Sequence, residues 1–339
     1  EIVAPGAYAS IQDAGRQGHR RIGVPWAGVL DRRLMHMANA LAGQDVGAPV
    51  VECIDGGLRV AARGGAVRVA VAGHAIVEQR AGGTWRGVPA WRSVTLAEDE
   101  ELRLRGMACG RLAVLSVAGL ALPGVLGSAS TYARAGLGGL DGRALGPGAR
   151  LPAVPAAHGP ERVLPTPPTR LDAPIRVVPG PQDDFFTDES LAILTRESYR
   201  VTSAADRMGV RLEGVALRHR GAREIASDAT VPGSVQVPGN GQPIVLLADA
   251  QTAGGYPKIG TVIGADLGRL ADARPGESLR FAWVSAREGE ALARAAHAHT
   301  LALLQAMRPL WPGGVDESAL YQGNLVSGMV NARRPDESV

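Results

Sequence analysis

One short stretch of the chain combines groups that could stabilise negative charge on a bound ligand. The segment TAGGYPKIG, residues 252 to 260, contains Lys258, the only lysine among the 36 Lys and Arg residues. A lysine ammonium is compact, its pKa falls on burial, and it can donate to a single developing oxyanion or phosphoryl oxygen, whereas an arginine fork needs more room. Because Gly-Gly-Tyr-Pro lets the backbone approach a ligand closely, we predict a catalytic Lys258; a solvated turn residue is the alternative.

Carboxamide side chains accompany this lysine. In the strand SVQVPG, alternation puts Gln236 on the face opposite Val235 and Val237, and the following prolines and glycines hold Asn240 and Gln242 at the tip of a bend. An amide donates and accepts at fixed geometry, as recognition of an amide, a lactam or a ureido group requires. The predicted ligand-binding residues are Gln236, Asn240, Gln242, Gln251, Thr252, Gly254, Gly255 and Tyr256.

The motif DRMG adds a carboxylate and a guanidinium. Asp206 could orient Arg207 or serve as a general base, so both are candidate catalytic residues. A structural ion pair that anchors a turn is an equal alternative.

Several common site motifs are missing from the sequence. No GxxxxGK[ST] occurs, because the sole lysine follows a proline, and neither GxSxG nor HExxH is found. His297 and His299 lie two apart, on different faces of the last expected helix, and we interpret them as surface or interface residues. We therefore expect no metal ion in the site.

The composition is typical of a folded protein with many tight turns. A chain of 339 residues with 45% hydrophobic residues exceeds one ordinary core, so two domains are expected. The net charge of +3 and the lack of a basic run argue against nucleic-acid binding. No signal peptide is apparent, and the most apolar window, 112–126, is shorter than the roughly 20 residues of a membrane span. Cys53 and Cys109 lack metal or redox spacing, which favours reduced thiols and a cytoplasmic protein.

The sequence predicts two copies of one β-rich unit. Segment 151–174 contains seven prolines and separates flanks in which an apolar strand leads to a Gly-rich loop and a Gly-Arg pair. Many short strands without a βαβ rhythm predict barrels or sandwiches. We expect an N-terminal β domain over 1–165, a C-terminal β domain with the polar site over 166–285, and a C-terminal helix and tail over 286–339.

Three helices carry clear start signals. Asp31 is expected to cap a helix that ends at Gly43, with Leu34, Met37, Ala38 and Leu41 on its apolar face. Thr187 precedes an acidic first turn, and Ser285 with Glu288 forms a capping box for a long helix that ends before Pro309.

Longer motifs resemble a known family. The segments SIQDAGRQGHRRIGVPWAG, STYARAGLGGLDGR, GPQDDFFT, DRMGVRLEG and PGSVQVPGNGQPIVLLAD, with QTAGGYPKIGTVI, are similar to those of the biotin-dependent carboxyltransferase family over about residues 1 to 285. That family includes the C subunit of 5-oxoprolinase, the KipA proteins, allophanate hydrolase subunit 2 and the carboxyltransferase segment of urea carboxylase. The resemblance implies a mainly β fold with two tandem cyclophilin-like β-barrels. This chain departs at Ala250, Val210 and Ala129, where members commonly have arginine, tyrosine and arginine.

The resemblance also implies a function and partners. As the C subunit of a 5-oxoprolinase, the chain would help to open 5-oxoproline to glutamate at the expense of ATP, together with a KipI-like partner, the B subunit, and with the A subunit. Lys258 would neutralise charge on the lactam oxygen or the transferred phosphoryl group, while Gln236, Asn240, Gln242 and Gln251 hold the ring. With no P-loop, an ATP site would have to be of another kind or shared with the partner, and we expect a shared site. No biotin would be attached, since Lys258 is the sole lysine.

Two alternatives stay open from the sequence. One is a carboxyltransferase that acts on urea or a related amide, with carboxybiotin on a separate carrier. The other is a KipA-like regulatory protein that binds a partner without turnover.

Overall fold

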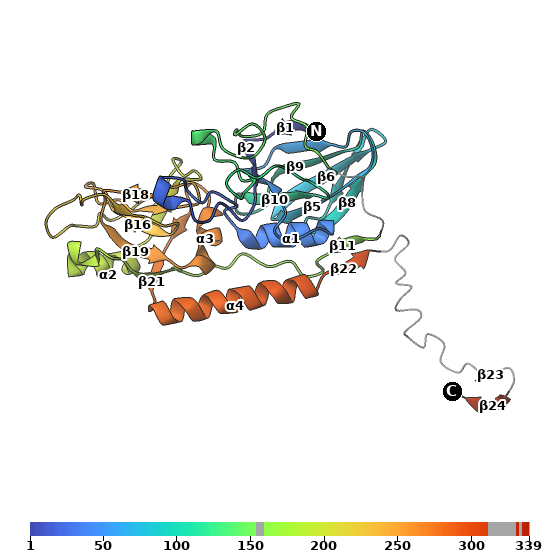
Figure 1. Ribbon diagram of the computed structural model, residues 1–339. Coiled ribbons are helices and arrows are strands. Elements are labelled where there is room, and N and C mark those ends of the chain that lie inside the picture. The colour runs from blue at the N-terminus through green and yellow to red at the C-terminus, as the bar shows by residue number, and fades with distance from the viewer. Residues whose placement is uncertain (154–158, 311–329, 332–333, 339) are drawn as a thin grey trace.

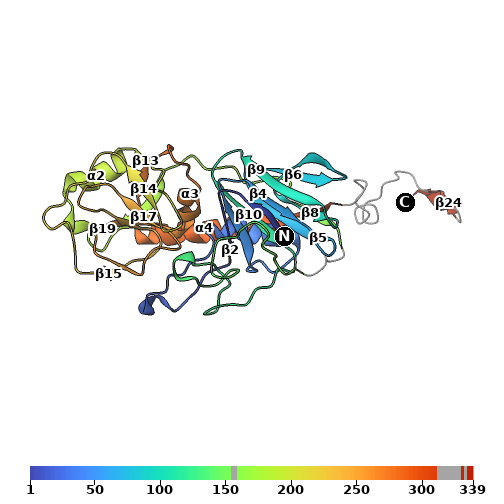
Figure 2. The same cartoon turned by 90° about the horizontal axis from the view of Figure 1, so that it is seen from above.

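The protein consists of two β-rich domains side by side, with a long helix running beneath both (Figures 1 and 2). The computed structural model describes residues 1–153, 159–310, 330–331 and 334–338. The expected mainly β architecture of two tandem cyclophilin-like barrels is confirmed. No helix in these described segments is long and apolar enough to cross a bilayer.

The first domain is built from two sheets that enclose an apolar core. The core takes alternate residues from both sheets, among them Ile11, Val71, Leu104 and Leu115, all buried. The five-stranded sheet has the order β1 (Ile2–Pro5), β4 (Leu58–Ala61), β9 (Glu101–Met107), β6 (Ala75–Ala81) and β7 (Thr84–Val88). The seven-stranded sheet has the order β2 (Tyr8–Gln12), β3 (Val50–Ile54), β10 (Leu112–Val117), β5 (Val67–Gly73), β8 (Arg92–Leu96), β11 (Glu161–Val163) and β22 (Arg308–Leu310).

The second domain is a single sheet that curls almost into a closed barrel. Its two edge strands, β20 and β21, are separated by Arg280 alone, so the sheet must bend round until its edges meet. Leu30, Ile54 and Leu112 of the first domain pack into its core, which joins the domains through apolar contact. The strand order is β20 (Ser278–Leu279), β13 (Tyr199–Val201), β14 (Gly209–Glu213), β17 (Ile244–Leu246), β16 (Ser234–Gln236), β19 (Lys258–Val262), β12 (Ile175–Pro179) and β21 (Phe281–Trp283). Two small sheets are formed by β15 (Asp228–Ala229) with β18 (Ala253–Gly254), and by β23 (Val330–Asn331) with β24 (Arg334–Ser338).

The helix starts predicted from the sequence are confirmed. Asp31 accepts from the Arg33 N–H at the start of α1 (Arg32–Ala42), which ends at Gly43 in the left-handed conformation. Thr187 caps α2 (Asp188–Arg196), and the Ser285 capping box starts α4 (Ala286–Gln305). The apolar face of α1 differs from expectation in detail, because Met35 is buried and Leu34 only partly so. The remaining helices are α3 (Gly264–Ala271), η1 (Arg20–Ile22), η2 (Ala133–Ala135) and η3 (Asp183–Phe185).

Helix α4 crosses from the second domain back to the first. It contacts α3 and β12 as well as α1, and the strand after it, β22, pairs with β11 in the first domain. The segment expected to form a C-terminal helix and tail thus also supplies an edge strand of the first domain's larger sheet. Most of the tail lies outside the described residues, and the boundaries at 165 and 285 stay predictions.

Candidate functional site

Lys258 and Gln236 lie opposite each other on neighbouring strands. Gln236 of β16 pairs with Lys258 of β19, and a β-bulge separates this pair from the next one, Val235 with Gly260. Directly opposed residues project from the same face of a sheet, and a bulge redirects the side chains beside it. Because Val235 and Ile259 pack in the apolar core, alternation sends Gln236 and Lys258 to the other face.

The small sheet of β15 and β18 covers this pair. Asp228 of β15 lies opposite Gly254 of β18, and Lys258 Nζ donates to Asp228 Oδ2 at 2.6 Å. The Lys258 side chain is 3% exposed, whereas that of Asp228 is 48% exposed. The Lys258 ammonium, helped by the Ala229 N–H and the Gln182 amide, holds the pKa of Asp228 below its usual value. A buried ammonium therefore lies beneath a carboxylate that is open to solvent.

Gln182 fixes both members of this ion pair from the loop before η3. Its Oε1 accepts from the Lys258 N–H at 3.2 Å, and its Nε2 donates to Asp228 Oδ2 at 3.1 Å. A Cβ at Gly180 would lie 2.1 Å from the Lys258 carbonyl oxygen. Only glycine lets this loop approach the strand so closely.

Gln236 and Gln251 form the carboxamide part of the site. Gln251 Nε2 donates to Gln236 Oε1 at 3.4 Å, and Gln236 Nε2 has no hydrogen-bond partner among the described residues. Gln236 is buried, and buried polar atoms nearly always bond to an acceptor or donor. A Cβ at Gly254 would lie 2.5 Å from Gln236 Nε2, so the glycine makes room for the amide. This N–H can donate to a ligand carbonyl or carboxylate.

The first domain contributes Arg20 to the same region. Its Nη2 donates to the Thr230 carbonyl oxygen and lies 3.4 Å from that of Gln251. Its guanidinium also lies 5.3 Å from the centroid of Trp26. In Figures 1 and 2 this dark blue segment extends from the first domain alongside the second. A cation from the first domain thus supports the loop that carries Gln251.

The backbone of residues 252–255 holds the covering segment in place. The Thr230 N–H donates to the Thr252 carbonyl at 3.1 Å, and the Ile225 N–H donates to that of Gly255 at 2.9 Å. Tyr256 is 38% exposed and remains at the surface. The predicted residues Thr252, Gly254 and Gly255 therefore act mainly through their backbone.

The residues around Lys258 are called the lysine cluster below: Arg20, Gln182, Asp228, Thr230, Gln236, Gln251 and Lys258. Asn240 and Gln242 do not belong to it. Asn240 is exposed, and its Oδ1 accepts from the Gln242 N–H at 3.1 Å, which closes the turn after β16. The Gln242 side chain bonds both backbone groups of Gly214, accepting at 2.8 Å and donating at 3.1 Å. The expectation that both amides hold the ligand beside Gln236 is corrected: the turn uses them to fasten itself to the end of β14.

Asp206 does not orient Arg207, which corrects the pairing inferred from DRMG. Asp206 is exposed, and its Oδ1 accepts from the N–H groups of Met208 and Gly209 at 2.8 and 3.2 Å. It thereby closes the turn into β14. Both residues line a cavity of about 340 Å³ to which Lys258 does not contribute. The alternative interpretation, an ion pair of Asp206 and Arg207 that anchors a turn, is right about the turn, but Arg207 pairs with Glu52 and Asp249 instead of Asp206.

Arg207 is the centre of a buried ion cluster between the domains. Its guanidinium donates to Asp249 through two bonds of 3.0 Å, to Glu52 of the first domain and to the Gly28 carbonyl. Burial opposes its charge, but the two carboxylates outweigh this and raise the pKa of Arg207. Burial also raises the pKa of Glu52, which Arg207 only partly offsets. The cluster fastens one domain to the other.

Four residues of the lysine cluster escaped the sequence prediction. Gln182 and Arg20 lie inside family motifs but show no pattern of their own, whereas Asp228 and Thr230 come from a two-residue strand and the residue after it. Arg20 and Thr230 are 210 residues apart in the chain. No local signal could have paired them.

The arrangement can bind and stabilise an anionic or amide-like group. Lys258 supplies a buried ammonium, and Asp228 supplies a counter-charge that an anionic ligand could replace. Gln236 supplies an amide N–H that no described residue accepts from. Throughout the described residues, no group of three or more His, Cys, Asp or Glu side chains is placed to hold a metal ion.

Sequence comparison connects the chain to named proteins. The family described as carboxyltransferase domain, subdomain A and B, matches residues 22–283. The chain is 37% identical over 297 residues to the 5-oxoprolinase C subunit of Escherichia coli (strain K12), covering 85% of this chain and 92% of that protein. It is 26% identical over 321 residues to the urea amidolyase of Lachancea kluyveri, covering 84% of this chain but only 17% of that protein.

Comparison of structures supports the same fold. The urea carboxylase of Kluyveromyces lactis superposes with a TM-score of 0.79 at 24% identity, covering 93% of this chain. The matched part is 30% of that longer chain.

Proposed function

The chain belongs to the carboxyltransferase family of subdomains A and B, and on this premise we propose that it is the C subunit of an ATP-dependent 5-oxoprolinase. The similarity to the Escherichia coli protein of that name runs through 92% of its length, whereas urea amidolyase is matched over a small part of its length. The partners in this proposal are the B subunit, which is of the KipI-like kind, and the A subunit. ATP would be bound jointly with a partner, and no biotin would be attached to this chain.

The observation that carries the proposal is the buried Lys258 opposite Gln236, whose Nε2 has no partner among the residues that the structure describes. In the reaction, the lactam oxygen of 5-oxoproline forms a bond to the γ-phosphorus of ATP while the bond to ADP breaks. Water then opens the phosphorylated imidate, which gives glutamate and phosphate. Lys258 stabilises charge on the phosphoryl oxygens, and it does so most strongly because burial lowers the local dielectric.

The carboxamides and Asp228 complete this assignment. Gln236 Nε2 donates to the substrate, and Gln251, bonded to Gln236 Oε1, fixes the orientation of that amide. Asp228 neutralises Lys258 before the substrate arrives and is exposed enough to move aside. Arg20 holds the Gln251 loop and acts as a positioning residue.

Reconstitution tests the proposed function. The chain is coexpressed with candidates for the two other subunits, and copurification is followed by measurement of ADP and glutamate release with 5-oxoproline. Release of both products in equal amounts is expected. Carboxylation of urea by carboxybiotin on a separate carrier would favour the second function, which the amide cluster and the urea amidolyase similarity support. Tight binding of a partner without turnover would favour a regulatory role.

Gly254→Ala should weaken substrate binding. The new Cβ would lie 2.5 Å from Gln236 Nε2, so the amide must move away from the position in which it can donate. Loss of one such hydrogen bond predicts a KM for 5-oxoproline raised by about 10-fold or more. Gly255→Ala is the matched control, since the contact nearest its Cβ is the Ile225 carbonyl oxygen at 3.4 Å. Equal KM values for the two variants would contradict the role of Gln236.

A further inference from the structure

One cation of the lysine cluster has no counter-charge among the described residues. The Nη2 of Arg20 donates to the Thr230 carbonyl oxygen and lies 3.4 Å from the Gln251 carbonyl oxygen. Both acceptors are neutral. Burial lowers the pKa of Arg20, and none of the described carboxylates lies near enough to raise it again. Because a charge removed from water is costly unless it is paired, the surroundings of Arg20 lack a negative group.

The other terminal nitrogen of Arg20 lacks an acceptor as well. Its Nη1 is shielded from solvent and has no hydrogen-bond partner in the part of the chain that the structure describes, although buried donors nearly always have one. The guanidinium lies 5.3 Å from the centroid of Trp26. An aromatic face attracts the cation, but it supplies no oxygen to the N–H groups. Nη1 can therefore donate to an oxygen atom of a ligand.

Thr230 connects this cation to the carboxamides. Its Oγ1 lies 3.4 Å from Arg20 Nη2 and donates to the Gln251 carbonyl oxygen. A Cβ at Gly254 would lie 3.4 Å from Thr230 Cγ2 and 2.5 Å from Gln236 Nε2, so the Thr230 side chain is close to the Gln236 amide. Two buried donors without acceptors, Arg20 Nη1 and Gln236 Nε2, thus lie near the same threonine.

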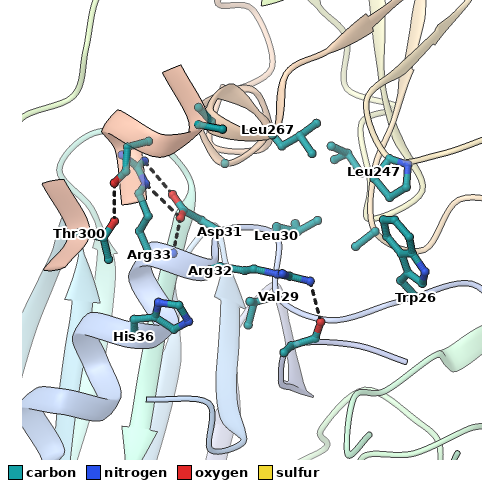
Figure 3. Close-up of a pocket in the computed structure, with 18 of the residues that line it drawn as sticks. Trp26, Val29, Leu30, Asp31, Arg32, Arg33, His36, Leu247, Leu267 and Thr300 are labelled. Atoms are coloured by element: carbon teal, nitrogen blue, oxygen red, sulfur yellow. Dashed lines mark hydrogen bonds and ion pairs between the residues drawn. The ribbon is translucent and has the colours of Figure 1, made fainter. Parts of the chain in front are cut away.

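The arginines of a neighbouring cavity differ from Arg20. Trp26 also lines a cavity of about 630 Å³ between the domains, which Arg20 does not line. Figure 3 shows Arg33 of this cavity paired with Asp31 at 3.0 Å, and Arg32 bonded to a backbone carbonyl. Arg32 is exposed to water. Neither of these arginines needs a ligand, whereas Arg20 Nη1 is reached by neither a carboxylate nor bulk water.

We propose that Arg20, beyond supporting the Gln251 loop, binds the carboxylate of the substrate through Nη1, while Gln236 and Lys258 bind its amide end. The inference rests on the proposed function and names the ligand class, a small lactam or amide that carries a carboxylate. 5-Oxoproline has both groups on one five-membered ring. Urea has no carboxylate and would leave Nη1 without an acceptor. Arg20 therefore makes the site selective for the lactam acid.

Paired substrates test this role in the reconstituted assembly. 5-Oxoproline and 5-oxoprolinamide share the lactam ring and differ in the charge of the second group. The wild type should prefer the acid in kcat/KM by about 10–100-fold, the range expected for a hydrogen bond between charged groups. Arg20→Gln should remove this preference by raising KM for the acid alone, and Arg20→Lys should restore part of it. Arg21→Gln, at the exposed neighbour, is the matched control and should keep the preference.

A purely structural Arg20 predicts a different result. If the guanidinium only supports the Gln251 loop, Arg20→Gln slows both substrates by the same factor and the preference for the acid persists. That outcome would overturn the inference, as would a wild-type assembly that turns over the acid and the amide equally well.

Equilibrium binding separates this site from the proposed function. Both compounds are titrated into the full chain and into its copurified assembly. Tighter binding of the acid than of the amide in the wild type and Arg21→Gln, but not in Arg20→Gln, supports the site even without turnover, in which case only the function fails. Turnover of 5-oxoproline with an unchanged preference in Arg20→Gln removes the site and leaves the function. If the acid is neither bound nor turned over, both fail.

Discussion

Lys258→Met is expected to lower kcat for ATP-coupled opening of 5-oxoproline by about 10²–10³-fold, the usual loss when one preorganised donor to a transition-state oxygen is removed. Methionine keeps the apolar stem of the buried side chain and removes the ammonium together with its hydrogen bond to Asp228. Its former partner Asp228 is 48% exposed, so the carboxylate left behind stays hydrated and the fold is retained. KM should change little, because Gln236 and its neighbours still bind the substrate.

Two companion variants sharpen this test. Lys258→Arg keeps the charge, but the planar guanidinium needs space that a 3% exposed side chain lacks, so the rate should also fall. Asp228→Asn removes the counter-charge while an amide oxygen can still accept from Nζ, and it should retain most of the rate. A Lys258→Met assembly that works at the wild-type rate would show that the ammonium has no part in catalysis.

Arg207→Leu is expected to destabilise the protein by about 3–5 kcal/mol, the typical cost of removing one partner from a buried ion cluster. The change leaves Glu52 and Asp249 buried without their cation, and these carboxylates belong to different domains. The midpoint of urea unfolding, followed by circular dichroism, measures the loss. A shift of under about 1 kcal/mol would contradict the structural role.

The pH dependence of the same variant has a definite sign. Burial already raises the pKa of Glu52 in the native protein, and loss of the guanidinium raises it further. The folded variant then holds a proton that the unfolded chain releases, so its stability should fall as the pH rises from about 5 to 8. Adding Glu52→Gln and Asp249→Asn should remove this slope and restore part of the stability. A slope that persists in the triple variant would locate its cause elsewhere.

These two predictions separate residues that the sequence placed in one catalytic group. Lys258 lies beside Gln236, whose Nε2 donor has no partner among the described residues. The Arg207 guanidinium instead donates to the carboxylates of Asp249 and Glu52 and to the Gly28 carbonyl. The loss of activity in an Arg207 variant would therefore follow from loss of the domain arrangement.

The helix starts and the alternation of the strands could be predicted from the sequence, because residues close together in the chain decide them. The caps at Asp31, Thr187 and Ser285 bond to N–H groups two or three residues away. Strand alternation placed Gln236 on the face opposite Val235 in the same way, since successive side chains in a strand point to opposite faces. The barrel fold could also be predicted, because long motifs of the sequence resemble those of the family.

Tertiary structure alone decided which polar groups meet. Glu52 and Arg207 are 155 residues apart, and the Asp228 side chain reaches Lys258 only because β15 folds over β19. Asn240 and Gln242 have the same chemistry as Gln236, yet a turn directs them to the backbone. Composition and spacing supply the functional groups, but long-range packing decides whether each one meets a ligand, a counter-ion or its own backbone.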